Sequence, residues 1–195
     1  EFFTKELGLP KEKLWVSVFE GTKNVPRDTE SFEIWKKLGI PESRIFFYGV
    51  EQNWWSRSGA PDKMPKGEIG GPDSEIFFDF GIKHNLKYGK KCHPNCDCGR
   101  FLEIGNSVFI EYEKQADGSL KELPRKNVDF GGGLERITMA VNNLQDVFQI
   151  DIYKPIIKKI EKAAGKKYED NKKAFRIIAD HIRASEVLAD EGVIP

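Results

Sequence analysis

The residues best suited to chemistry lie in a glycine-rich stretch at positions 127–136, which reads Asn-Val-Asp-Phe-Gly-Gly-Gly-Leu-Glu-Arg. The pattern predicts a strand end, a sharp turn and a helix start. Glycines at 131–133 let a flat ligand lie against the backbone, because no β-carbon intrudes. The helix start offers free N–H groups to an anion, and Arg136 can stack on a purine or hold a phosphate. Asp129 can oppose an ammonium group. A plain glycine-rich turn followed by a surface arginine is the alternative.

A strand predicted at 100–112 adds two polar side chains, Glu103 and Asn106. Strict alternation puts them on opposite faces, whereas a bulge at Gly105 would bring them together. Glu103 then suits a Mg²⁺ ion that bridges phosphates, and Asn106 suits a small polar substrate. The alternative is a half-exposed sheet with two solvated polar residues.

Trp54 and Trp55 fall in a Gly- and Pro-rich stretch, residues 51–73, that predicts a long loop. Long loops in compact domains are usually functional or disordered. The pair therefore either walls a small pocket or supplies ordinary core aromatics.

All three cysteines lie between residues 92 and 98, in a polar insert predicted at 81–99. Three thiolates this close together can share one Zn²⁺ ion, with Cys92, Cys96 and Cys98 as ligands and His93 or His84 as the fourth. Because His93 adjoins Cys92, shared ligation by that pair is strained. Three reduced cysteines without a metal are the alternative.

Bulk composition narrows the class of protein. Thirty-one basic and 31 acidic residues cancel, so the average charge predicts no partner and a nucleic-acid contact requires a local patch. An odd number of cysteines argues against a disulfide scaffold and for a reducing compartment. No apolar run approaches the roughly 20 residues that span a bilayer. We expect a cytoplasmic protein that does not enter a membrane, and a fragment, since a helical pattern is already running at residue 1.

The predicted strands and helices together form an α+β fold. Residues 1–148 predict a mostly antiparallel sheet with a Cys-rich insert at 84–100, and residues 149–195 predict a separate helical segment. The predicted strands are 14–19, 45–48, 75–80, 100–112 and 127–130; the predicted helices are 29–38, 133–144, 152–164 and 171–190.

Residues 131–137 resemble the third signature motif of class II aminoacyl-tRNA synthetases. Several further segments, in the same order, are similar to the alanine–tRNA ligase family within that class. These segments are 53–55, 71–77, 102–109 and 127–129, followed by 175–184 and 189–193, which resemble the opening of the family's tRNA-binding helical region.

The resemblance implies a partial class II catalytic domain followed by the start of a tRNA-recognition domain. The implied activity is ATP-dependent activation of L-alanine to alanyl-adenylate and its transfer to tRNA(Ala), with Mg²⁺ accompanying ATP. Asp129 and Arg136 are the implied catalytic residues. The implied alanine-binding residues are Trp55, Asn106, Asp129 and Gly131. The implied ATP-binding residues are Glu103, Gly131, Gly133 and Arg136. Arg176 and Arg183 are candidates for tRNA contact.

The chain departs from the family pattern in several places. It has Gly105 where the family usually has tryptophan, and Phe130 where the family usually has a small polar residue. The loop at 59–70 lacks the usual Gly-Pro-Cys. The first two signature motifs, with the arginine that holds the α-phosphate, are missing, as are the editing and C-terminal domains. Two other functions stay open: a paralogue that binds alanine or adenylate without charging tRNA, and a zinc-stabilised RNA-binding module without catalysis.

Overall fold

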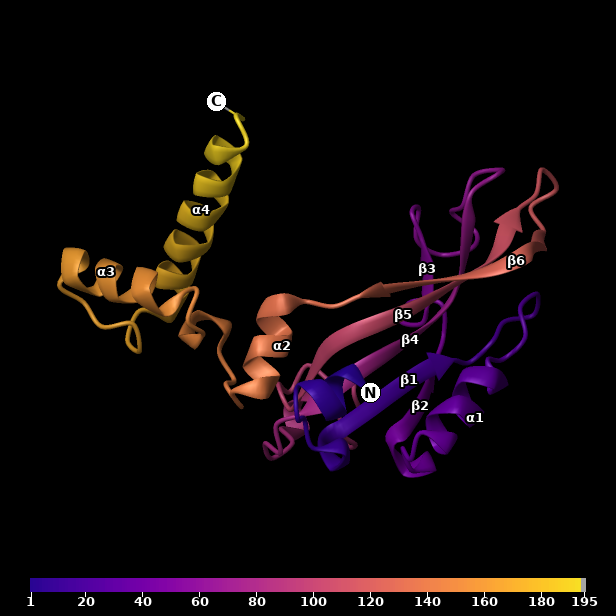
Figure 1. Cartoon of the computed structure of the whole chain (residues 1–195), viewed down its shortest axis with the longest axis horizontal. Coiled ribbons are helices and arrows are strands. Elements are labelled where there is room, and N and C mark those ends of the chain that lie inside the picture. Colours follow the sequence, from indigo (N-terminus) through magenta and orange to yellow (C-terminus); the bar gives the residue numbers. More distant parts are fainter. Residues whose placement is uncertain (194–195) are drawn as a thin grey trace. The chain divides into compact units, whose positions relative to one another are not determined.

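The computed structural model describes residues 1–193 and is built around a six-stranded sheet. The strand order is β2-β1-β4-β5-β6, with β3 paired to β4 (Figure 1). β1 and β2 run parallel, and every other pair is antiparallel. The predicted α+β class with a mostly antiparallel sheet is confirmed. The strands are β1 (Leu14–Phe19), β2 (Ile45–Tyr48), β3 (Trp54–Ser56), β4 (Ile69–Asp79), β5 (Phe101–Lys114) and β6 (Leu120–Gly131).

The four α-helices are α1 (Thr29–Lys37), α2 (Leu134–Val141), α3 (Lys154–Ala164) and α4 (Lys172–Asp190). A π-helical turn covers Phe2–Glu6, and 3-10 turns cover Lys11–Lys13, Glu42–Arg44, Leu86–Tyr88 and Val147–Gln149. Local signals set the helix ends. The Asp28 carboxylate accepts the Ser31 N–H at 2.8 Å and caps α1. α3 ends at Gly165, whose φ of 61° is left-handed. No helix among the described residues is long and apolar enough to cross a membrane.

The chain divides into two compact units, Glu1–Asn143 and the residues from Leu144 onward. The first holds the sheet, α1 and α2. Its main core covers one face of the sheet, where Val16, Ile76 and Ile104 are buried. α1 lies along β1 and β2 (Figure 1) and packs Phe32 and Trp35 against this core.

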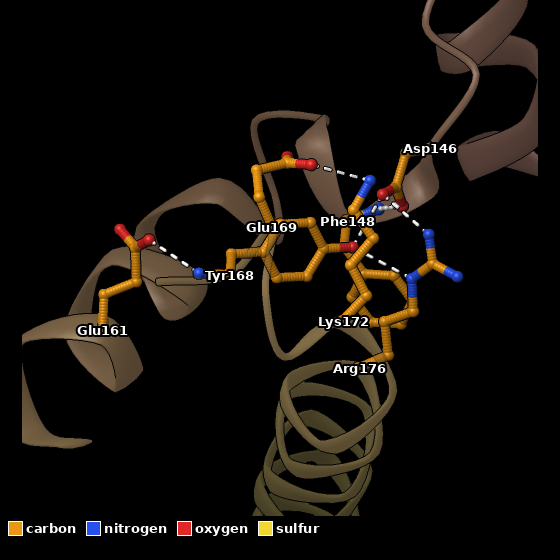
Figure 2. A network of polar contacts seen from close by, with 7 residues as sticks. All are labelled: Asp146, Phe148, Glu161, Tyr168, Glu169, Lys172 and Arg176. Carbon is orange, nitrogen blue, oxygen red and sulfur yellow. Dashed lines mark hydrogen bonds and ion pairs between the residues drawn. The ribbon is translucent and has the colours of Figure 1, made fainter. Parts of the chain in front are cut away.

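The second unit holds α3 and α4 together with a polar network (Figure 2). The Asp146 carboxylate accepts hydrogen bonds from Tyr168 Oη at 2.7 Å, Arg176 Nη2 at 2.8 Å and the Phe148 N–H at 3.1 Å. Arg176 Nε also donates to Tyr168 Oη at 2.9 Å. These contacts join the start of the unit to both the α3–α4 connection and α4. The role predicted for residues 149–195 as a tRNA-recognition segment stays a prediction, and its last two residues lie outside the described ones.

The stretch 51–73, predicted as a loop, contains β3 and the first part of β4. Two of its glycines, Gly70 and Gly71, lie where strands approach closely. A β-carbon on Gly71 would lie 1.8 Å from the carbonyl oxygen of Phe109, and one on Gly70 would lie 2.6 Å from that of Trp55. Composition alone therefore gave the wrong assignment, since glycine in a strand can mark close backbone contact as well as a turn.

Candidate functional site

A polar cluster occupies the sheet face opposite the main core. On β1, Val16 and Val18 belong to the core, so Ser17 between them projects to the other face. Glu75 on β4 meets it there, since Ser17 Oγ donates to Glu75 Oε2 at 3.0 Å. Ser17 is fully buried, and Glu75 is 9% exposed. This face thus carries buried polar groups where the core face carries aliphatic ones.

Asn53, just before β3, ties this cluster together. Its Nδ2 donates to Ser17 Oγ at 2.8 Å and to Asp73 Oδ1 at 3.0 Å. Asn53 is fully buried and Asp73 is 2% exposed. Two carboxyl groups, Asp73 and Glu75, are therefore held side by side in a site that water reaches poorly.

Strand register brings two predicted site residues to the same face. Glu75 pairs with Asn106 on β5, and Asn106 pairs with Gly131 on β6. One row along, Asp73 pairs with Val108, which pairs with Asp129. Directly opposed residues share a face, as do residues two apart on one strand. Asn106 and Asp129 therefore project on the same side as the buried carboxyl groups.

A bulge in β5 adds Glu103 to this face. Gly105 pairs with Ile76 but Glu103 pairs with Phe77, so the extra residue is Ile104. The sequence predicted a bulge at Gly105; the structure places it one residue earlier, because the fully buried Ile104 side chain belongs to the core. The expected effect is the same, since Glu103 and Asn106 end up on one face.

Arg136, in the first turns of α2, pairs with Glu103. Its Nη1 donates to Glu103 Oε2 at 2.7 Å, and the two side chains remain 50% and 34% exposed. The stem of Arg136 crosses Gly133, where an added β-carbon would lie 3.3 Å from it. A β-carbon on Gly131, by contrast, would meet nothing within 4 Å. The glycine turn therefore positions the arginine on one side and leaves open space on the other.

Burial perturbs both carboxyl groups of the cluster. Desolvation raises the pKa of Asp73 to about 6, opposed by hydrogen bonds from Asn53 and Asn106. Desolvation, with the nearby Asp73 charge, raises the pKa of Glu75 to about 7. Perturbed carboxyl groups in such surroundings are typical of functional sites, and they favour a bound cation because its charge would offset theirs.

Two unsatisfied side-chain atoms belong to this cluster. Within residues 1–193, four buried side-chain atoms have no hydrogen-bond partner: Trp15 Nε1, Asn53 Oδ1, Trp54 Nε1 and Asn106 Oδ1. Each such atom costs about 1–3 kcal/mol unless something meets it. Asn53 and Asn106 both hydrogen-bond Asp73, so their two amide oxygens are free acceptors beside a carboxyl group. A ligand with N–H donors and a positive charge would satisfy them.

Two predicted residues are more exposed. Asp129 is exposed, and its Oδ1 accepts the Phe130 N–H at 2.9 Å. Trp55 is 42% exposed, whereas Trp54 is buried against Phe19 and Tyr112. Of the tryptophan pair, Trp54 is thus the core residue and Trp55 remains the candidate for contact with a ligand.

Comparison with known proteins decides the family. A family model described as "tRNA synthetases class II (A)" matches residues 1–195. The chain belongs to the class II tRNA synthetases of this group. It is 46% identical over 201 residues to the alanine–tRNA ligase of Petrotoga mobilis, 45% over 199 residues to that of Thermotoga maritima, and 44% over 204 residues to that of Borrelia hermsii. Each alignment covers 100% of this chain but 21%, 22% and 32% of the respective relative. The chain therefore spans a fifth to a third of these proteins.

This class II synthetase chain carries a second cluster in the insert between β4 and β5. His84, Cys92, Cys96 and Cys98 place one ligand atom each within 4.8 Å of the others. His93, predicted as a ligand, is not among them: its Nδ1 lies 3.0 Å from Tyr48 Oη. His84, the other histidine considered, is the one that joins the sulfurs.

The thiol pKa values of Cys92 and Cys98 shift in opposite directions. Burial raises the pKa of Cys92 to about 11, reinforced by Cys98. Burial acts in the same direction on Cys98, but hydrogen bonds from His84, the Arg100 backbone and Cys92 outweigh it and lower that pKa to about 6. The cluster thus favours one thiolate even without a cation.

The arginines predicted to contact tRNA make intramolecular contacts in the second unit. Arg176 pairs with Asp146 and Tyr168, as described above (Figure 2). Arg183 Nη1 donates to Tyr153 Oη at 2.9 Å, and its guanidinium lies 5.1 Å from the centre of that ring. Both therefore contribute to the packing of the unit.

Sequence reasoning missed part of the candidate site. Ser17, Asn53, Asp73 and Glu75 were not among the predicted site residues. A signal was present, since Asp73-Ser74-Glu75 interrupts an apolar strand. Ser17 gave none, because a single serine among apolar residues also occurs at exposed positions of ordinary strands.

Proposed function

We propose that this chain is part of an alanine–tRNA ligase, and that the polar sheet face holds alanine and ATP while alanine is activated. Full-length similarity of the chain to three alanine–tRNA ligases supports this. Because the chain spans only a fifth to a third of them, the activity belongs to the longer protein.

The proposed reaction begins with attack of a carboxylate oxygen of alanine on the α-phosphorus of ATP. The new P–O bond gives alanyl-adenylate, and pyrophosphate leaves. A hydroxyl at the 3′ end of tRNA(Ala) then takes the alanyl group and releases AMP. Catalysis of this kind depends chiefly on positioning and on stabilising charge.

The ammonium group of alanine is the ligand that best suits the cluster. Asn106 Oδ1 is a buried acceptor without a partner, and Asp129 projects on the same face one row away. Asp129 would supply the opposing charge and Asn106 a directed acceptor, while Trp55 and Gly131 would border the small substrate. The single observation that carries the proposal is this unfilled acceptor on a face bearing several carboxyl groups.

ATP would lie along the glycine turn. Gly131 leaves open space above the backbone, and Gly133 precedes the first turn of α2, where N–H groups can meet phosphate. Arg136 would hold the nucleotide, by stacking on adenine or binding phosphate. Glu103 is partly exposed and fits a Mg²⁺ ion that arrives with ATP, since that ion favours carboxylates combined with phosphate oxygens.

The second unit would meet tRNA(Ala), with Arg176 and Arg183 as candidate contacts. Because charged tRNA is used in translation, we infer that the enzyme works in the cytoplasm. A Zn²⁺ ion in the insert would take no part in this chemistry, because its four donors are separate from the polar face.

The test is alanine-dependent exchange of pyrophosphate into ATP by the longer protein, followed by alanylation of tRNA(Ala). Glycine and serine serve as control substrates. Exchange with alanine and subsequent charging are the expected results. Exchange without charging would instead identify the paralogue that binds alanine and makes adenylate, and the absence of exchange with alanine would contradict the proposal.

A further inference from the structure

The four donors of the insert lie within 4.8 Å of one another, and two pairs among them have the spacing of a tetrahedral metal site. Zinc–sulfur bonds of about 2.3 Å in a tetrahedron separate two sulfur ligands by about 3.8 Å. Cys92 Sγ and Cys98 Sγ lie 3.6 Å apart, and Cys96 Sγ lies 3.8 Å from His84 Nδ1. A disulfide needs about 2.05 Å between sulfurs, so the arrangement matches shared ligation and not a Cys92–Cys98 bond.

The orientation of His84 supports the same conclusion. Its Nε2 lies 2.9 Å from the carbonyl oxygen of Gly89, and a carbonyl can only accept, so Nε2 carries the proton. The lone pair of a neutral imidazole then belongs to Nδ1, the atom that faces the sulfurs. Metal-binding histidines are usually held this way, with the second ring nitrogen donating to a carbonyl or carboxylate.

We propose that His84, Cys92, Cys96 and Cys98 bind one Zn²⁺ ion, and that this ion holds the Cys92–Cys98 loop against the sheet face of the candidate site. Three thiolates and an imidazole are soft ligands that select zinc over Mg²⁺ or Ca²⁺. Four protein ligands fill a tetrahedral ion and leave no position for water, so its role is structural.

The insert is fixed at its base as well. Arg100 Nε and Nη2 donate to the two oxygens of Asp79 at 2.8 and 2.6 Å, where β4 and β5 meet. This ion pair joins the two ends of the insert, but it does not hold the loop between Cys92 and Cys96. The Zn²⁺ ion would hold that loop in place.

Residues between the ligands touch the polar face. Asn95 Nδ2 lies 3.5 Å from Glu75 Oε2, and His93 Nδ1 lies 3.0 Å from Tyr48 Oη. The metal-bound loop therefore forms one wall beside a buried carboxyl group of the cluster. Asn95 acts as a positioning residue: it steadies Glu75, and its own place depends on the ion. This second step rests on the proposed function, whereas metal binding does not.

Metal content tests the site. The longer protein, purified without chelator, should hold about one more zinc ion per chain than its Cys96→Ser variant, by mass-spectrometric metal analysis. Taking the difference removes any zinc bound elsewhere. His93→Ala is the matched control and should keep the full zinc content. Equal zinc in the wild type and Cys96→Ser would overturn the site, as would loss of zinc in His93→Ala but not in His84→Ala.

A second pair of variants covers the case in which Cys96→Ser does not fold. His84→Cys should retain the ion, because Cys₄ is also a zinc site, and His84→Ala should bind it at least about tenfold more weakly. Cobalt substitution gives an independent readout. Cobalt bound to three thiolates absorbs visible light, and a wild-type protein without that absorption would overturn the site.

Kinetics test the link to the active site. Asn95→Ala should keep its zinc and raise the alanine KM about threefold to tenfold, the range expected for one lost hydrogen bond. His84→Ala should shift the same constant in the same direction. An unchanged alanine KM in both variants, with zinc confirmed in the wild type, would overturn the positioning role. Loss of all exchange in the wild type would instead contradict the proposed function.

Discussion

The ring of Phe130 lies directly over Gly105: a β-carbon on that glycine would come within 2.8 Å of Phe130 Cζ. Phe3 closes the same space from the other side, with its Cζ 3.2 Å from that position. Both positions are among those where the resemblance implies a departure from the family pattern, with tryptophan expected at 105 and a small polar residue at 130. We infer that the two departures compensate each other, because the Phe130 ring fills the volume that a side chain at position 105 would occupy.

Substitutions at Gly105 and Phe130 should therefore have strongly coupled effects on the free energy of unfolding. Gly105→Trp alone should destabilise the sheet unit by about 3 kcal/mol or more, because the indole and the Phe130 ring compete for one space. Phe130→Thr alone should leave a cavity. The double variant should recover at least about 1 kcal/mol relative to the sum of the single changes. Chemical denaturation of all four proteins measures the coupling, and additive effects would argue against compensation.

Sequence patterns predicted the sheet and its helices because periodicity reports which face of an element is buried. They could not predict the register. Asp129 and Asn106 share a face because Asn106 is opposite Gly131 and Val108 is opposite Asp129, and register follows from long-range pairing. The same limit applies to Asn53 and Ser17, which lie 36 positions apart and meet only in the folded chain. Local motifs thus led to the residues of the glycine turn, whose roles stay predictions, and missed the buried network of Ser17, Asn53, Asp73 and Glu75.

The buried carboxyl groups should make stability depend on pH. The pKa of Asp73 rises from 3.8 to about 6 on folding. Between those values the folded protein holds a proton that the unfolded chain has lost, so the free energy of unfolding falls as pH rises. Asp73→Asn should flatten this dependence and stabilise the protein at pH 8 by about 1–3 kcal/mol.

Thermal unfolding at pH 5 and pH 8 provides the measurement. Asn keeps the oxygen that accepts from Asn53, so the hydrogen bond survives while the charge is removed. Glu42→Gln, at an exposed position, is the control and should follow the wild type. An Asp73→Asn protein less stable than the wild type at pH 8 would show that the carboxylate itself stabilises the fold.

Asp146 and Arg176 should matter for the integrity of the second unit. Asp146 accepts three hydrogen bonds and its side chain is 12% exposed, so Asp146→Ala leaves the Tyr168 hydroxyl and Arg176 Nη2 without their acceptor. We expect a loss of about 1–3 kcal/mol and faster hydrogen exchange in α3 and α4. Unchanged exchange in these helices would show that the network does not hold the unit together.

Arg183→Ala separates a tRNA role from packing. Arg183 contacts Tyr153, so some stability is lost in either case. If the arginine also meets tRNA, charging should fall more than adenylate formation, and the excess should shrink at high salt because phosphate contacts are screened. Arg176→Ala is the comparison, since that side chain is already paired with Asp146. Equal losses in both assays for Arg183→Ala would assign it to packing alone.

In the proposed alanine site, Asp129 is the residue on which substrate binding should depend most. Alanine offers an ammonium, a carboxylate and one methyl group, and an ammonium in a partly desolvated pocket needs an opposing charge. Asp129 lies at the end of β6, on the face that carries Asn106, and directly before the glycine turn. Its carboxylate can therefore meet the ammonium while the glycines accommodate the nucleotide. Asp129 does not cap α2, because the N-cap residue of that helix is Gly133.

In the longer enzyme, Asp129→Asn should keep the fold and ATP binding, since Asn retains the oxygen that accepts the Phe130 N–H. It should lower kcat/KM for alanine by a factor on the order of 10² or more, as expected when a charge-assisted contact of a few kcal/mol is lost. Alanine-dependent pyrophosphate exchange measures this. Asp117→Asn, an exposed change in the turn between β5 and β6, is the matched control and should exchange at the wild-type rate. Near-wild-type exchange by Asp129→Asn would contradict the assignment of Asp129 to the ammonium group. The buried carboxyl groups would then be the candidates, and Asp73→Asn should lower kcat/KM for alanine.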